Sequence, residues 1–152
     1  MKNEIEVKAE RIGEEAWNYH KHGLNCAECV LKAALTNYNT DLPEEVICIA
    51  SGFGGGIGRS RHLCGAISGA VMALGMFKGR RDPLAEDSKT VTEIYPDFKE
   101  IITEIEECFG TTICGEMLAK YKDGTNNPMI NNCDDVIKYC AKTLVKYIER
   151  ED

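Results

Sequence analysis

Hydrophobic residues recur every three or four positions in three stretches of the chain, which is the spacing of one buried helix face. The first stripe runs from Ile5 to Tyr19, and the second runs from Ile94 to Cys108. A third and wider stripe runs from Val136 to Ile148. Alternation with a period of two residues is scarce, so no strand is predicted. The pattern therefore predicts an all-α fold.

The segment from Cys64 to Gly79 is small or apolar on every side, which predicts a helix at the centre of the fold. Each glycine costs a helix about 1 kcal/mol relative to alanine, so several glycines indicate that another backbone comes close. Tight packing in a small bundle accounts for them, and a homodimer through this helix is also compatible with them. We expect one compact bundle of about five to seven helices around this glycine-rich helix, forming a single domain over residues 1–152.

Prolines and polar clusters predict where some helices begin and end. Pro43 is predicted to start a helix, and Pro96 is predicted to open the helix that follows it. The polar segment from Tyr121 to Asn132 contains Gly, Pro and several Asn, which predicts a loop. His20 and His22 lie near the end of the first predicted helix, where histidines interact favourably with the helix C-terminus.

Composition and charge exclude two classes of protein. The 152 residues include 18 Lys and Arg against 25 Asp and Glu, which gives a net charge of −7. Binding to nucleic acid needs a basic surface, so we expect no nucleic-acid partner. No apolar run reaches the ~20 residues of a membrane span, and the charged N-terminus does not resemble a signal peptide. We therefore expect a cytoplasmic protein without a membrane partner.

Cysteine is abundant for a protein without an export signal, with eight residues in the chain. Thiols in a reducing compartment more often bind metals or react than form structural disulfides. Four of the cysteines follow capping residues or a glycine-rich loop, and so lie at or near predicted helix N-termini. These four are Cys26, Cys64, Cys114 and Cys133.

A helix N-terminus offers free backbone N–H groups and partial positive charge. Both stabilise a thiolate, so we expect these four thiols to have pKa values below the usual value of about 8.5. Arg59, Arg61 and His62 precede Cys64 and would strengthen the effect. The thiolate is the form that attacks disulfides and the form that binds metals.

The remaining cysteines give weaker signals. Cys29 forms a CxxC pair with Cys26, but the strand context of a thioredoxin site and the second close pair of a zinc finger are both missing. Val30 follows Cys29, so there is no CxxCH motif for c-type haem. We expect Cys48 and Cys140 to be small buried hydrophobic residues.

The glycine-rich loop from Ser51 to Arg59 fits neither the dinucleotide fingerprint nor the P-loop. Its glycines allow unusual φ angles, and its N–H groups could contact anions or cluster sulfurs. A plain flexible turn is the alternative. If the loop surrounds a metal site, the contributing residues are predicted to be Gly54, Gly55, Gly56 and Arg59.

The chain resembles the C_GCAxxG_C_C family of redox-active proteins, and the resemblance extends over most of its length. It implies a helical fold, a redox role and functional positions for Cys26, Cys64, Cys114 and Cys133. Some relatives, the split-Soret cytochromes, add c-type haem motifs and have an iron centre attributed to the cysteine-bearing part. This chain lacks those haem motifs. The matching pieces are Asn25-Cys26-Ala27-Glu28 with Val30-Leu31, residues 52–59, Cys64-Gly65-Ala66 with Gly69, Cys114 and Cys133.

Three functions are therefore expected in order of preference. In the first, the four cysteines bind a [2Fe–2S] or [4Fe–4S] cluster and the protein exchanges electrons with a redox partner protein. In the second, the chain is a thiol–disulfide oxidoreductase or redox sensor that uses Cys26, Cys29 and Cys64 without a metal. In the third, zinc holds the bundle together. The other cysteines, Cys29, Cys48, Cys108 and Cys140, are additional to the family pattern, and Cys29 could replace Cys26 or pair with it.

Overall fold

The computed structural model describes residues 2–120 and 128–150, apart from the side chains of residues 120 and 128–132. This part of the chain contains seven α-helices, one 3₁₀ helix and no strand, which confirms the predicted all-α class. None of the described helices is both long enough and apolar enough to span a bilayer. The elements are α1 (Glu4–Lys21), α2 (Cys26–Asn37), η1 (Glu44–Phe53), α3 (Gly54–Ile57), α4 (Gly65–Lys78), α5 (Val91–Phe109), α6 (Cys114–Lys120) and α7 (Pro128–Glu149).

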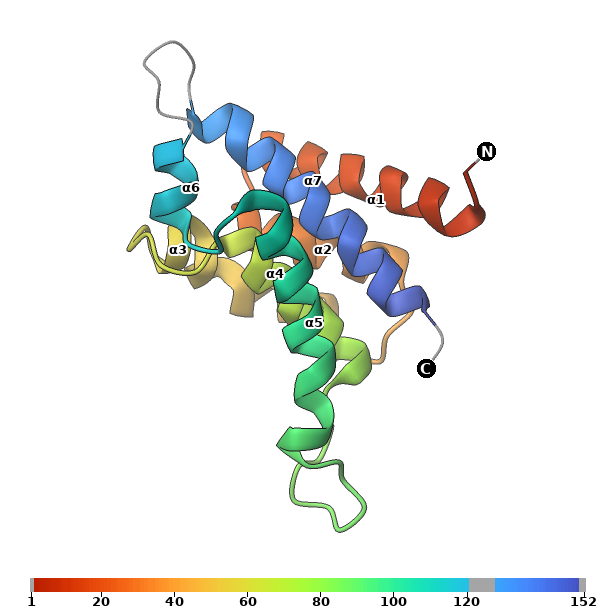
Figure 1. Cartoon of the computed structure of the whole chain (residues 1–152). Coiled ribbons are helices and arrows are strands. Elements are labelled where there is room, and N and C mark those ends of the chain that lie inside the picture. Colours follow the sequence, from red (N-terminus) through yellow and green to blue (C-terminus); the bar gives the residue numbers. More distant parts are fainter. Residues whose placement is uncertain (1, 121–127, 151–152) are drawn as a thin grey trace.

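The first and last helices lie side by side in opposite directions, so α1 begins and α7 ends on the same side of the bundle (Figure 1). Gly13 lets α1 approach α7 closely, because a Cβ on it would lie 2.8 Å from the Cγ of Lys142. An ion pair of 2.6 Å between Lys8 Nζ and Glu149 Oε1 joins the N-terminal half of α1 to the C-terminal end of α7. The pair α1–α7 therefore forms one side of the bundle.

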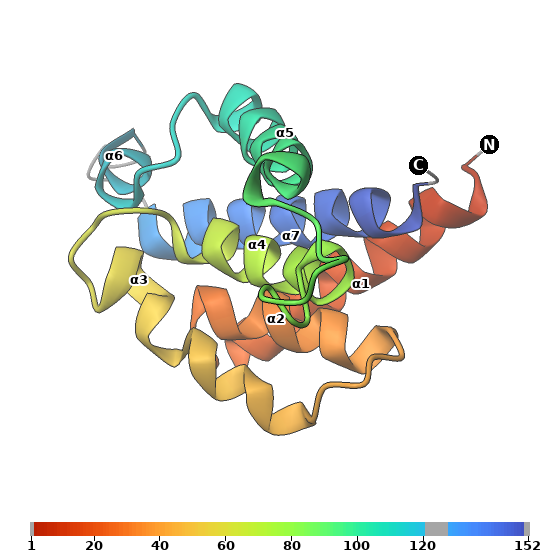
Figure 2. The same ribbon diagram turned by 90° about the horizontal axis from the view of Figure 1, so that it is seen from below.

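Helix α4 lies in the middle of the bundle, between α7 and α2 (Figure 2). It contacts α2, α3, α5, α7 and η1. At Gly69 a Cβ would lie 2.5 Å from the carbonyl oxygen of Ala27, so the backbones of α4 and α2 touch there. The glycines that the sequence placed in a central helix thus serve a close helix–helix approach within the chain.

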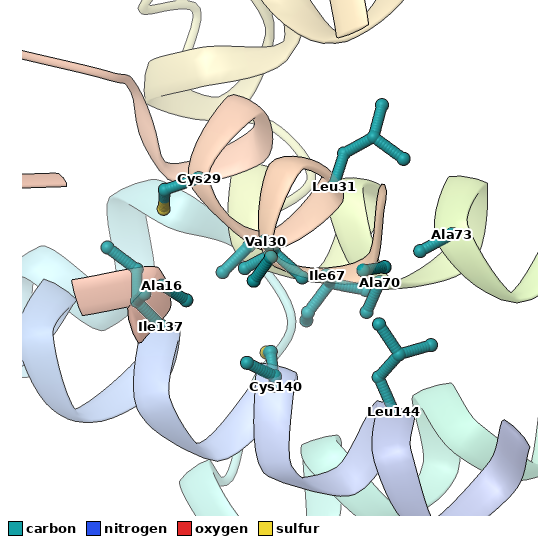
Figure 3. Packing of buried hydrophobic residues seen from close by; sticks show 14 of the residues in the cluster. Ala16, Cys29, Val30, Leu31, Ile67, Ala70, Ala73, Ile137, Cys140 and Leu144 are labelled. Atoms are coloured by element: carbon teal, nitrogen blue, oxygen red, sulfur yellow. The ribbon is translucent and has the colours of Figure 1, made fainter. Parts of the chain in front are cut away.

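The core between these helices is built from aliphatic side chains of α2, α4 and α7 (Figure 3). Val30, Ile67 and Leu144 are almost completely buried there. Full burial of one such side chain contributes about 1.5–3 kcal/mol to folding. Cys29 and Cys140 occupy the same core, so two of the eight thiols are packed among hydrocarbon.

Two segments far apart in sequence meet where α4 and α6 begin. Leu63 and Ile113 form an isolated antiparallel bridge. The backbone N–H of Cys64 donates to the carbonyl oxygen of Thr112 (2.9 Å), and a second bond from the N–H of Cys114 back to the first segment is 2.6 Å long. This pairing fixes the starts of two cysteine-bearing helices next to each other.

Helix α5 begins earlier than the prediction from Pro96. Its N-cap is Thr90, whose hydroxyl accepts from the N–H of Glu93 while the Glu93 carboxylate accepts from the N–H of Thr90. Pro96 therefore lies inside α5, and the prediction that it opens the helix was wrong. Its missing N–H leaves only the Thr92 carbonyl without a helical donor, which a long packed helix tolerates.

The expected loop from Tyr121 to Asn132 is also only partly right. Residues 121–127 lie outside the described residues, but α7 already begins at Pro128. A proline is well suited to the first helical position because its φ is fixed and its N–H would be unpaired there anyway. Cys133 consequently lies inside α7. The sequence had predicted it near the helix N-terminus, and that prediction was wrong. Pro43 does precede a helix, but that helix, η1, is of the 3₁₀ type.

Candidate functional site

A cavity of about 940 Å³ lies where α1 ends and where α2, α4 and α6 begin. Four cysteines from four different helical segments line it: Cys26, Cys64, Cys114 and Cys133. They are the four that the sequence singled out, spread over more than a hundred residues. The structure therefore gathers these sulfurs around one space, although their role as metal ligands stays a prediction.

The position of Cys26 follows from the capping box at the start of α2. The Asn25 side chain accepts from the N–H groups of Ala27 and Glu28, and the Glu28 carboxylate accepts from the Asn25 N–H (2.9 Å). The predicted capping residue before Cys26 is thus present as part of a capping box, which makes Cys26 the first residue of α2. The sulfur of Cys26 then packs directly on Gly65, where a Cβ would collide with it.

The glycine-rich segment between η1 and α4 folds back over the cavity in a run of left-handed residues. Gly56 is buried, and a Cβ on it would lie 2.6 Å from the backbone nitrogen of His62 and 2.7 Å from the Cβ of Cys114. Only glycine fits there. Gly54, Gly55 and Arg59 line the cavity, whereas Gly56 does not, and their place around a metal stays a prediction. The residues of this segment with positive φ are Gly55, Gly56, Ile57, Gly58, Arg59 and Arg61.

Two arginines reach the cavity from this strained segment. The Nη1 of Arg61 lies 3.7 Å from the sulfur of Cys114 and donates a hydrogen bond to it. Arg59 also lines the cavity, and neither arginine has a carboxylate partner within residues 2–120 and 128–150. His62, the third predicted contributor, is exposed and does not line the cavity.

The predicted low thiol pKa values are wrong for three of the four cysteines. Burial raises the pKa of Cys64 to about 12, and burial together with the neighbouring Cys26, Cys64 and Cys114 raises the pKa of Cys133 to about 12. Burial also raises the pKa of Cys26, although the backbone N–H of Gly55 acts in the opposite direction. Loss of solvation thus outweighs the helix N-terminus. These thiols hold their protons at neutral pH.

The remaining four cysteines do not line the cavity. Cys29 is buried behind Cys26, and its S–H donates to the Cys26 carbonyl oxygen at 3.2 Å. Cys140 is completely buried in the core, as predicted. Cys48 was predicted to be buried, but it is exposed, because η1 turns Ala50 and not Cys48 toward the core. Cys108 is exposed on α5.

The arrangement of donors does not suit a single metal ion. Among the described side chains, no three His, Cys, Asp or Glu groups lie close enough to hold one ion. A tetrahedral zinc site needs each sulfur about 2.3 Å from the metal, which draws the sulfurs into near contact. No three of the described donors lie at that spacing.

Sequence reasoning did not single out the part of the lining that comes from the end of α1. Trp17 and Lys21 line the cavity together with His20, which was read only as a helix-end residue. The signal was present, since Trp17 and Lys21 lie one helical turn apart just before the Gly23 that follows the helix. What the sequence could not give is that this turn faces cysteines elsewhere in the chain.

Comparison with known proteins agrees with the cysteine pattern. The sequence profile of the family described as "Putative redox-active protein (C_GCAxxG_C_C)" matches residues 24–147. A curated protein of Archaeoglobus fulgidus, titled "Uncharacterized protein", is 29% identical over 97 residues, which cover 61% of this chain and 64% of that protein. The match thus spans less than two thirds of that relative's length. No solved structure matches the chain.

Proposed function

Since the chain belongs to the C_GCAxxG_C_C family of redox-active proteins, we propose that it binds an iron–sulfur cluster and transfers electrons. The ligands would be Cys26, Cys64, Cys114 and Cys133. The observation that carries the proposal is the convergence of these four sulfurs on one cavity. When bound, a cluster of this kind would supply one-electron redox chemistry at the site.

The donor set supports a cluster over a lone metal ion. Four soft thiolates are the usual ligands of [2Fe–2S] and [4Fe–4S] clusters. A [4Fe–4S] cluster takes one thiolate on each iron, so it accepts a wider ring of sulfurs than one ion does. The glycines at positions 56 and 65 keep the space beside Cys114 and Cys26 free of side chains.

The surrounding residues would prepare the thiols for metal. The backbone N–H of Gly55 favours the thiolate form of Cys26, and Arg61 lies beside Cys114. Because burial holds protons on Cys64 and Cys133, ligation must release these protons. Cluster uptake is therefore expected to become more favourable as the pH rises.

The proposal is tested by anaerobic reconstitution with iron and sulfide. The expected product absorbs near ~400 nm and holds iron and sulfide in equal amounts. Single Cys→Ser changes at Cys26, Cys64, Cys114 or Cys133 should each lower the iron content, whereas Cys48→Ser and Cys108→Ser should not. A colourless, iron-free product would overturn the proposal, as would equal loss of iron in the control variants.

Two alternatives receive less support. A thiol–disulfide site needs an accessible thiol with a lowered pKa. Burial instead raises the pKa of Cys26 and Cys64, and the Cys29 thiol is buried and bonded to a carbonyl. A structural zinc ion would need donors closer together than the described side chains provide.

A further inference from the structure

The cysteine-lined cavity is larger than a metal cofactor requires. Its volume of about 940 Å³ lies near the top of the range for small-molecule sites, roughly 300–1,000 Å³. Part of its wall comes from Trp17 and Lys21 at the end of α1, which contribute no sulfur. The lining therefore leaves a region whose chemistry the cluster proposal does not use.

Two lysines flank the Trp17 ring in this part of the molecule. The Nζ of Lys21 lies 3.8 Å from the centre of the ring, and the Nζ of Lys138 lies 4.4 Å from it. Lys138 is paired with Glu14 at 3.2 Å, whereas Lys21 has no carboxylate partner among the described residues. The indole Nε1 is fully buried, so Trp17 offers its ring and not its N–H to the cavity.

The charges around the cavity are unbalanced toward the positive. Lys21, Arg59 and Arg61 line it, and none of the three has a carboxylate partner among the described residues. Among the described residues, Asp134 is the one carboxylate in the lining. In a chain with a net charge of −7, a concave cationic surface concentrates anions.

The rest of the lining is apolar. Leu24 follows α1, Leu118 lies on α6, and Val136 and Ile137 lie on α7. An inorganic anion would leave these side chains unused, whereas an organic molecule would cover them. The wall thus combines three cations with a hydrocarbon surface.

We propose that the cavity binds a small organic carboxylate beside the cysteines. Its carboxylate lies near the Lys21 ammonium group, which is held over the Trp17 ring. Arg59 and Arg61 attract it from the glycine-rich segment, and its apolar body lies against the side chains of α6 and α7. This site is separate from the cluster ligands and extends beyond electron transfer.

The test uses benzoate as the probe and the reduced, full-length protein. Trp17 is the sole tryptophan of the chain, so its fluorescence reports directly on this cavity. Titration calorimetry provides a second readout. Benzamide, which has the same shape without the charge, should bind about tenfold more weakly than benzoate, and inorganic phosphate should also bind more weakly.

Variants identify the residues involved. Lys21→Gln should weaken benzoate binding by about tenfold in calorimetry, because it removes one charged contact. Lys146→Gln is the matched control. That lysine is exposed on α7, beyond the cavity lining, and its replacement should change benzoate affinity by less than about twofold.

Three results would overturn the inference: no benzoate binding up to about 10 mM by either readout, equal affinity for benzoate and benzamide or phosphate, or an unchanged affinity in Lys21→Gln. The measurement is made before and after reconstitution with iron and sulfide. A protein that binds benzoate but takes up no iron contradicts only the cluster proposal. One that takes up iron but not benzoate contradicts only the carboxylate site.

Discussion

Gly69 and Gly75 lie on the same helix but have different surroundings, which makes them a matched pair. A Cβ at position 69 would lie 2.5 Å from the Ala27 carbonyl oxygen, whereas a Cβ at position 75 would meet nothing within 4 Å. We expect Gly69→Ala to lower the free energy of unfolding by about 1–3 kcal/mol through overpacking. Gly75→Ala should raise it by about 0.5–1 kcal/mol through helix propensity. Urea denaturation measures both, and equal effects would contradict the close contact of α2 and α4.

The thiol of Cys140 links stability to pH. Burial holds its pKa well above the ordinary value, so in the unfolded chain it ionises near pH 8.5 while the folded thiol keeps its proton. Above that pH the unfolded state gains stability, and unfolding becomes easier by up to about 1.4 kcal/mol per pH unit. We expect Cys140→Ala to reduce this decline, measured by urea denaturation between about pH 8 and pH 10. The same slope in both proteins would contradict the prediction.

At the level of elements, the cap of α2 serves both the helix and the site. Asn25 caps α2, its Nδ2 donates to the Ser51 carbonyl oxygen (2.9 Å), and it packs under Gly54. Thr90 has the same capping role on α5, away from the cavity. Asn25→Ala and Thr90→Ala should each cost about 1 kcal/mol of stability in urea denaturation. Only Asn25→Ala should also lower iron uptake, and a matching loss in Thr90→Ala would contradict this dual role.

The sequence predicted elements well where one face carries a regular stripe and less well where proline was the signal. The stripes of α1, α5 and α7 were recognised because their apolar spacing records burial directly. The starts of α5 and α7 were misplaced at Pro96 and Asn132. Proline is compatible with both a helix start and a helix interior near its N-terminus, and the choice depends on a cap and on packing.

The candidate site, like the helices, was predicted from the sequence only in part. Which cysteines gather was predicted from their positions near helix starts, and the structure places all four at one cavity. Their raised pKa values were not predicted, because burial arises from contacts between distant segments, such as the Cys26 sulfur against Gly65, which local sequence does not encode. The contribution of Trp17 was missed for the same reason.

At the scale of the whole molecule, cluster binding should stabilise the bundle globally. The proposed ligands belong to α2, α6 and α7 and to the residue that precedes α4, so a bound cluster would cross-link most of the fold. A ligand present at 100 times its Kd adds about 2.7 kcal/mol to the free energy of unfolding. We therefore expect the reconstituted protein to have a higher Tm than the metal-free protein in differential scanning calorimetry. Chelation of the iron should reverse the gain, and an unchanged Tm would contradict cross-linking.

The place of Cys133 on α7 has a consequence for biosynthesis. A ribosome makes about 5–20 residues per second from the N-terminus, and α7 emerges after the other described helices. Until then α1 lacks its antiparallel neighbour and the fourth sulfur does not exist. Acquisition of a cofactor that needs all four sulfurs must therefore wait until the ribosome has made α7.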